Sequence, residues 1–145
     1  MKLSSSAFKD TQPIPDIYSI KGGNESPPLS ISDVPDAAVS LAVIVHDPDA
    51  PSGDFTHWLF WNLSPDSTTI RQNELPPEAI EGQNDLGNNH WDGPAPPSGI
   101  HHYIFIAYAL DILMDLPLDS SRYELDEAIE DHIIKAAELV GTFSA

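Results

Sequence analysis

Residues Ile44–Leu63, IVHDPDAPSGDFTHWLFWNL, decide how this chain folds. An apolar run ends at Asp47, a turn with two prolines follows, and a run rich in aromatic residues begins at Phe55. Apolar, β-branched and aromatic runs bounded by Pro, Gly and Asp are typical of β-strands. We therefore predict strands over Ala38–Asp47 and Phe55–Leu63, joined by a turn that proline makes stiff.

A second stretch, Trp91–Asp111, reads WDGPAPPSGIHHYIFIAYALD and predicts another strand over Tyr103–Leu110. The preceding segment, Gly82–Ser98, is rich in Gly, Asn and Pro and predicts a long ordered loop. Fourteen prolines and eight glycines interrupt the 145 residues too often for long helices. This pattern predicts a single domain, residues 1–145, that is mainly β: an antiparallel β-sandwich with Greek-key-like connections.

The clearest helical signal begins at Ser121, where Ser121 and Glu124 have the spacing of a capping box. One apolar face follows, made by Leu125, Ala128, Ile129 and His132. Leu75–Ile80 predicts at most one further helical turn, so the sandwich carries one or two peripheral helices. Ile133–Phe143 fits either a continuation of the helix or a last strand, and periodicity does not decide between them.

The chain is strongly acidic, with six Lys and Arg against 23 Asp and Glu and a formal net charge of −17. Such a field repels nucleic acid and anionic membrane surfaces. The absence of cysteine excludes disulfides, and no apolar run is long enough to span a bilayer. Since the first residues also lack the apolar core of a signal peptide, we expect a cytoplasmic protein without integral membrane contact.

Histidines collect where lysine and arginine are scarce. Between His46 and Leu118 the only Lys or Arg is Arg71, whereas five of the six histidines lie in that span. Any local positive charge there must come mainly from imidazolium. His101 and His102 are neighbours on a predicted strand, so only one of them can face a shared pocket, and Tyr103 shares the face of His101.

The turn after the first strand offers two carboxylates. Asp47 and Asp49 would point the same way in an extended chain, which places both beside His57 in one polar space. The alternative is that the two aspartates only cap the turn by accepting hydrogen bonds from nearby backbone N–H groups. For Asp49 we leave the two interpretations open, while the flanking prolines favour a functional Asp47. Three tryptophans are expected in the core or the pocket wall: Trp58, Trp61 and Trp91.

Taken together, these motifs resemble the phosphatidylethanolamine-binding protein family, also called Raf kinase inhibitor-like proteins, in its compact bacterial and archaeal branch. Ordered segments along nearly the whole chain carry the resemblance: GGNESPPLSISDVP, SLAVIVHDPDAPSGDFTHWLFWNL, GQNDLGNNHWDGPAPPSGIHHYIFIAYALD and HIIKAAELVGTFS. The resemblance implies a β-sandwich whose pocket accepts phosphate, a phosphorylated headgroup or another small anion. The residues implied to line it are Asp47, Asp49, Pro51, His57, Gly93, Pro96, Pro97, His101 and Tyr103.

The same resemblance implies a final strand over Ile133–Phe143 and a cis bond between Ala50 and Pro51. One departure is His102, because the bacterial branch usually has an arginine there. We expect His57 and His101 to donate hydrogen bonds to the anion, with help from backbone N–H groups of the Gly93–Pro97 loop. Asp47 is expected to hold one imidazole in its donor tautomer.

A regulatory binding module is favoured over an enzyme. The sequence has no HExxH motif, no HxH pair on one face and no Gly-x-Ser-x-Gly nucleophile, so we expect neither catalysis nor a metal or other cofactor. The alternative is a protein-interaction inhibitor of a kinase or protease whose pocket is vestigial. Aromatic residues in the loops are also compatible with a homodimer.

Overall fold

The computed structural model describes all residues, 1–145, and contains nine strands, one 3-10 helix and one α-helix. In chain order the elements are β1 (Lys2–Ser4), β2 (Gln12–Pro13), η1 (Asp16–Tyr18), β3 (Leu29–Ser32), β4 (Ser40–Asp47), β5 (Phe55–Leu63), β6 (Thr69–Ile70), β7 (Ile80–Glu81), β8 (Ile100–Leu110), α1 (Arg122–Ile129) and β9 (Ile133–Ser144). This composition confirms the prediction of a mainly β protein.

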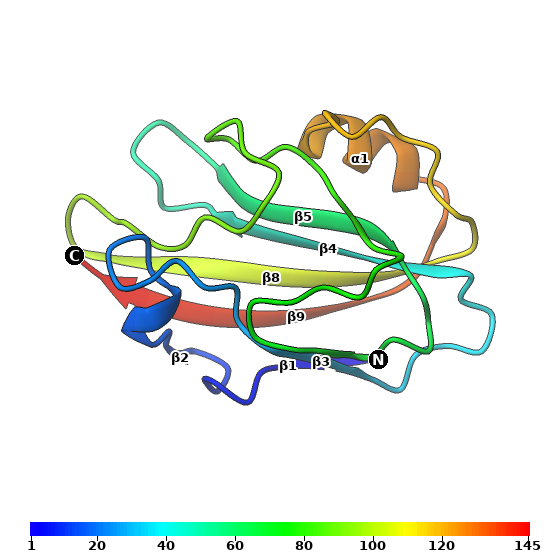
Figure 1. Cartoon of the computed structure of the whole chain (residues 1–145), viewed down its shortest axis with the longest axis horizontal. Coiled ribbons are helices and arrows are strands. Elements are labelled where there is room, and N and C mark those ends of the chain that lie inside the picture. Colours follow the sequence, from blue (N-terminus) through cyan, green and yellow to red (C-terminus); the bar gives the residue numbers. More distant parts are fainter.

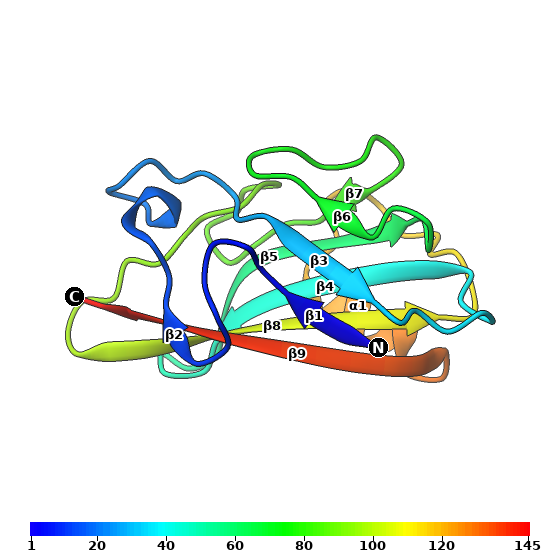
Figure 2. The same cartoon turned by 90° about the horizontal axis from the view of Figure 1, so that it is seen from below.

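The strands form two sheets that pack face to face (Figures 1 and 2). The large sheet has the order β2-β9-β8-β4-β5-β7, and the small sheet has the order β1-β3-β6. All neighbours are antiparallel except the two-residue pair of β2 and β9. A cluster of 19 buried apolar residues fills the space between the sheets, which makes the fold a β-sandwich.

Strand β4 runs through the centre of the large sheet, and all eight of its residues are buried. Its side chains alternate between two cores. Leu41, Val43 and Val45 face the small sheet, whereas Ala42 and Ile44 belong to a second cluster on the opposite side. A strand segment covered on both faces must be apolar, as Leu41–Val45, LAVIV, is.

Helix α1 covers the second cluster, on the face of the large sheet opposite the small sheet (Figure 1). Leu125 and Ile129 are buried there. The helix begins at the predicted capping box, in which the Ser121 backbone N–H donates to the Glu124 carboxylate at 3.0 Å. His132, which we expected on the same face, lies beyond the helix end and pairs with Asp111 at 2.8 Å.

The structure confirms the three long predicted strands and decides the two open segments. Ile133–Phe143 is part of β9, which pairs with β8 along its length, so the helix ends before it. Leu75–Ile80 contains no helical turn, because its prolines leave an irregular segment that leads into β7. The short strands β1, β2, β3, β6 and β7 were not predicted.

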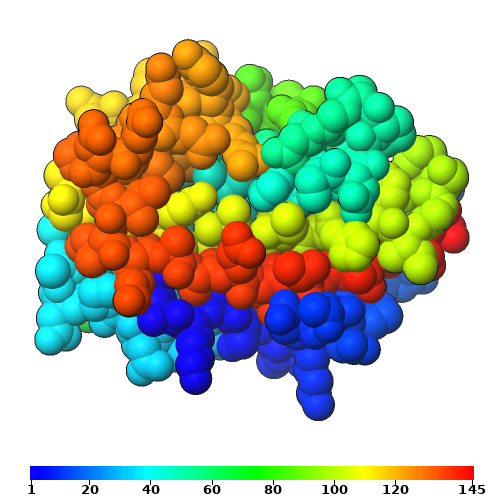
Figure 3. All heavy atoms as spheres, turned by 180° about the vertical axis from the view of Figure 1, so that it is seen from behind, coloured from blue at the N-terminus to red at the C-terminus, as the bar shows by residue number.

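Strands β8 and β9 reach the surface on one side of the molecule, between α1 and the N-terminal segment (Figure 3). Aromatic residues contribute little to the exposed surface. Trp58, Trp61 and Trp91 are buried, and Tyr123 is the only largely exposed aromatic residue, at 68%. Exposed aromatic residues therefore lend little support to a homodimer, which stays a prediction.

Candidate functional site

A pocket of about 270 Å³ opens at the end of the large sheet where β4 ends and β5 and β8 begin. Eight of the nine predicted residues line it: Asp47, Pro51, His57, Gly93, Pro96, Pro97, His101 and Tyr103. Polar side chains from three strands meet in its interior, while Ile20, Phe55 and Leu86 add apolar surface. The structure thus brings together two loops that are about forty residues apart in the sequence.

Three other hollows, two of about 380 Å³ and one of about 390 Å³, are larger than this pocket. One is lined by Trp58, Glu81 and His90, and the other two contain no histidine. None of them brings two buried imidazoles together. We therefore assign the candidate site on its chemistry and not on its volume.

His101 faces the pocket because β8 turns alternate side chains inward. Its Nδ1 lies 2.6 Å from Oδ2 of Asp47, at the end of β4, and both residues are buried. The other oxygen of Asp47 accepts the Asp49 backbone N–H at 2.8 Å. Asp47 therefore fixes the orientation of the His101 ring. A neutral ring held through its Nδ1–H presents Nε2 to the pocket as an acceptor, so it is not in the expected donor tautomer.

His57 reaches the pocket through a β-bulge. Val45 pairs with Trp58 and His46 pairs with Thr56, so His57 is an extra residue in β5. A bulge of this kind redirects a side chain, and here both His57 and Trp58 face the space between the sheets. Burial lowers the pKa of the His57 imidazole, against the opposing effects of its hydrogen bond to Asp92 and of nearby carboxylates.

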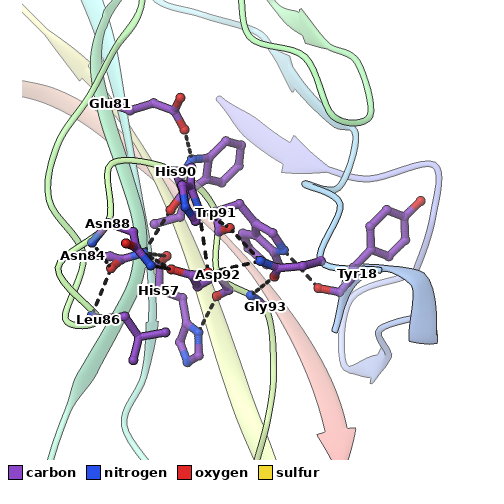
Figure 4. Close-up of polar contacts among 12 residues, drawn as sticks. Tyr18, His57, Glu81, Asn84, Leu86, Asn88, His90, Trp91, Asp92 and Gly93 are labelled. Carbon is purple, nitrogen blue, oxygen red and sulfur yellow. Dashed lines mark hydrogen bonds and ion pairs between the residues drawn. The ribbon is translucent and has the colours of Figure 1, made fainter. Parts of the chain in front are cut away.

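The His57 ring is held by residue Asp92, which sequence analysis missed (Figure 4). His57 Nδ1 donates to the Asp92 backbone carbonyl at 2.7 Å. The buried Asp92 carboxylate in turn accepts hydrogen bonds from the side-chain amides of Asn24, Asn84 and Asn88, at 3.1, 2.8 and 2.9 Å. Burial alone would raise the pKa of Asp92, but these amides lower it.

The role of Gly93 comes from close packing. A Cβ atom at this position would lie 1.8 Å from the Tyr18 carbonyl oxygen, so only glycine fits. The same carbonyl accepts the Trp91 indole N–H at 2.9 Å, which fastens the loop to η1 (Figure 4). Nothing in the sequence indicates this partner, which is 73 residues away.

Backbone donors from the Gly93–Pro97 loop are fewer than predicted. The Gly93 N–H already donates to the Asn24 side chain at 2.7 Å, and the three prolines of the loop have no N–H. Only the Ala95 N–H remains without a protein acceptor. The prediction of several loop N–H donors is therefore wrong.

Asp49 does not line the pocket, so the predicted pair of carboxylates in one space is also wrong. The chain turns directly after Asp47, and the alternation of an extended strand stops there. Asp49 instead accepts the backbone N–H of His102 at 2.8 Å and the His102 ring Nδ1 at 2.7 Å. These two bonds lower the pKa of Asp49 and tie the turn to β8 on the exposed side.

The expected cis bond between Ala50 and Pro51 is wrong as well, because every peptide bond in the structure is trans. Pro51 is exposed and lines the pocket, and its trans bond follows the normal preference. That preference is about 0.5–1 kcal/mol for a bond before proline.

Tyr103 supplies a hydroxyl beside the two imidazoles. Its ring lies 5.2 Å from the His57 ring, centroid to centroid, in an edge-on arrangement. The hydroxyl has no protein hydrogen-bond partner, yet it is not among the fully enclosed polar atoms, so it is open to the pocket. Burial, together with the charges of Asp47 and Asp49, raises the pKa of Tyr103 and keeps this donor protonated.

The pocket contains neither lysine nor arginine. No group of three or more His, Cys, Asp or Glu side chains lies close enough together to hold a metal ion. The arrangement offers two imidazoles and two hydroxyls, those of Tyr103 and Ser52, to a ligand. Such a set suits a small polar ligand bound by hydrogen bonds.

Comparison with known proteins shows that the family resemblance covers almost the whole chain. The sequence model described as "Phosphatidylethanolamine-binding protein" matches residues 4–144. The chain belongs to this family. A UPF0098 protein of Methanothermobacter thermautotrophicus is 45% identical over 148 residues, which cover 99% of this chain and 98% of that protein.

Solved structures of the family share the fold closely. The phosphatidylethanolamine-binding protein homologue CT736 of Chlamydia trachomatis is 41% identical, with a TM-score of 0.95 and coverage of 99% of this chain and 97% of that one. YbcL of Escherichia coli, described as a member of the mammalian family, is 29% identical with a TM-score of 0.94. Its match covers 99% of this chain and 98% of YbcL.

Two observations bear on the predicted cytoplasmic location. None of the helices combines the length and the apolar character that crossing a membrane requires. A family relative from Mycobacterium tuberculosis, 36% identical over 145 residues, carries the name of a lipoprotein, LppC. The cytoplasmic location therefore stays a prediction.

Proposed function

We propose that this protein is a regulatory binding module whose pocket takes a small anion, namely phosphate or a phosphorylated headgroup. The observation that carries the proposal is the meeting of His57, His101 and Tyr103 inside one pocket of about 270 Å³. All three side chains are buried, hydrogen bonds hold the two imidazoles, and the Tyr103 ring packs against the His57 ring, so the site is formed before a ligand arrives.

The apolar part of the pocket also supports an organic phosphate. Ile20 and Leu86 are 40% and 51% exposed, and Phe55, whose ring lies 4.9 Å from the His57 ring, is a third apolar lining residue. An ester group attached to the phosphate would contact this surface while the phosphate meets the imidazoles.

The absence of lysine and arginine from the pocket makes binding depend on pH. Because positive charge there must come from imidazolium, affinity is expected to rise on acidification from about pH 7.5 to 5.5. Burial lowers the pKa of His57, so its contribution continues to grow below the ordinary histidine value of about 6.5.

An NMR titration with phosphate and with phosphoethanolamine tests the proposal. We expect the signals of His57 and His101 to shift together and to saturate. His102 serves as the control, because it lies on the exposed side of the same strand. Shifts confined to residues outside the pocket, or affinity that stays flat between about pH 7.5 and 5.5, would contradict it.

We propose binding without catalysis. Elemental analysis of the purified protein and an assay for phosphate release from phosphoethanolamine test this part. A stoichiometric metal or steady turnover would show that the site is an enzyme's.

A protein partner, a kinase or a protease, is the second candidate, and the exposed Ile20 and Leu86 beside the pocket favour it. A pull-down from native lysate with wild type and His57→Ala separates the two candidates. A partner retained equally by both proteins would point to a surface that works without the pocket.

A further inference from the structure

We propose that the pocket selects phosphoryl groups that carry a proton, namely inorganic phosphate and phosphomonoesters, over sulfate and phosphodiesters. The inference rests on the proposed anion-binding function and adds the class of ligand. It follows from counting which polar atoms at the pocket donate hydrogen bonds and which accept them.

Both histidines use Nδ1 within the protein. Nδ1 of His57 lies 2.7 Å from the Asp92 carbonyl oxygen, and Nδ1 of His101 lies 2.6 Å from the Asp47 carboxylate. A carbonyl and a carboxylate accept hydrogen bonds, so Nδ1 carries the proton in each ring. A neutral imidazole has one N–H, and its Nε2 is then an acceptor.

The two Nε2 atoms are open to the pocket. Neither has a protein partner, and neither is among the fully enclosed polar atoms without one. His57 and His101 thus present two lone pairs, while the side-chain donors among the lining residues are the hydroxyls of the buried Tyr103 and the exposed Ser52. Both oxygens of Asp47 are already occupied, by His101 and by the Asp49 N–H.

The charges around these rings are negative. The carboxylates of Asp47, Asp85 and Asp92 act on His57, and Asp47 contacts His101 directly. Asp49, bound to His102, lies behind His101 on the outer side and carries a further negative charge. With no Lys or Arg in the pocket, a fully deprotonated anion would meet lone pairs and carboxylates.

A proton on the ligand removes this conflict. The P–OH group of a phosphomonoester monoanion donates to one Nε2, and its remaining oxygens accept from Tyr103 and Ser52. The second pKa of a phosphomonoester is about 6, so this proton is available near neutral pH at small cost. Sulfate and phosphodiesters carry no proton near neutral pH. They can therefore bind well only when a pocket histidine is protonated.

Calorimetry with methyl phosphate and dimethyl phosphate tests the inference, because these probes differ by one methyl group. At about pH 7.5 we expect methyl phosphate and inorganic phosphate to bind about tenfold or more tightly than dimethyl phosphate or sulfate. In two buffers with different ionisation enthalpies, methyl phosphate should take up about one proton on binding. Dimethyl phosphate that binds as tightly as methyl phosphate, or binding without proton uptake, would overturn the inference.

Phosphoethanolamine identifies the source of the phosphoryl group. An affinity equal to that of inorganic phosphate indicates that the phosphoryl group alone is recognised, and a higher affinity indicates a headgroup monoester. Both results support the inference as long as the monoester exceeds the diester.

Two further measurements distinguish the loss of the Nε2 lone pair from a general effect of a substitution on folding. His57→Gln replaces the lone pair by an amide that donates without titrating, so the preference for methyl phosphate over dimethyl phosphate should narrow, while His102→Gln should keep it. Nitrogen NMR of the unmodified protein needs no variant: Nε2 of both pocket histidines should be unprotonated in the free protein at about pH 7.5. An Nε2–H tautomer on both rings would overturn the inference.

The two proposals fail differently. If none of the four anions binds anywhere between about pH 7.5 and 5.5, both the proposed function and this inference fall. If all four bind with similar affinity, the anion pocket stands and the selection by protonation is wrong.

Discussion

Two neighbouring histidines on strand β8 each pair with an aspartate, and their side chains point to opposite sides of the strand. His101 holds Asp47 at 2.6 Å, and His102 holds Asp49 at 2.7 Å, both through Nδ1. The side chains of the first pair are 9% and 4% exposed, whereas those of the second pair are 55% and 42% exposed. The same contact thus occurs once inside a pocket and once in solvent.

The comparison teaches that a histidine–carboxylate contact does not by itself make a site. The chain contains three more such pairs, His46–Asp54 at 2.7 Å, His132–Asp111 at 2.8 Å and His90–Asp92 at 3.7 Å, and none of them lines the pocket. His101 differs from its counterparts because His57 and Tyr103 face the same enclosed space. Burial and a second imidazole give the inner pair its proposed role.

The largest expected difference between the two pairs is in stability. Asp47→Ala leaves the His101 ring N–H and the Asp49 backbone N–H without their buried acceptor, and should lower the free energy of unfolding by about 3 kcal/mol. Asp49→Ala removes an exposed pair and should cost less than about 1 kcal/mol. Urea unfolding followed by tryptophan fluorescence measures both, and equal losses would erase the distinction between inner and outer pairs.

Ligand binding should separate the pairs next. His101→Ala removes a hydrogen bond to a charged ligand, so phosphate affinity at about pH 6 should fall about tenfold to a hundredfold. His102→Ala leaves the pocket lining intact and should stay within about twofold of wild type. Calorimetry on both variants, with circular dichroism as the control for folding, tests this. If His102→Ala lost more phosphate affinity than His101→Ala, the ligand would bind on the exposed side of β8 and not in the pocket.

The pH dependence of stability tests His57, the second buried histidine of the pocket. Its lowered pKa means that below about pH 6.5 the unfolded chain takes up a proton that the folded protein does not. Stability should therefore fall as pH decreases from about 6.5 toward the folded pKa, by at most about 1.4 kcal/mol per pH unit from this group. His57→Gln should make the profile flatter, as measured by urea midpoints in the absence of ligand. A slope unchanged by the substitution would assign the acid sensitivity to other groups.

The smallest expected effect is that of restoring a cation on the outer side. His102→Arg introduces the residue usual in the bacterial branch, next to Asp49 and outside the pocket. The exposed pair is worth less than about 1 kcal/mol, so phosphate affinity should change by less than about fivefold. A gain of more than about tenfold would show that the outer side takes part in binding.

Sequence reasoning succeeded where side chains follow local periodicity. The opposite orientations of His101 and His102 come from the alternation of a strand, and the helix start comes from a four-residue capping box. It failed for Asp49, because alternation ends where the chain turns. It also overlooked Asp92, whose importance depends on Asn24, a residue 68 positions away.

The amino-acid sequence alone determined the strands around Asp47 and Tyr103, the family resemblance and the scarcity of cations near the histidines. All of these are properties of composition and of neighbouring residues. Only the tertiary structure decided that a bulge turns His57 inward, that Asp92 holds its ring and that Gly93 passes the Tyr18 carbonyl. Register between strands and contacts between distant loops set these features, because they depend on how separate segments pack against each other.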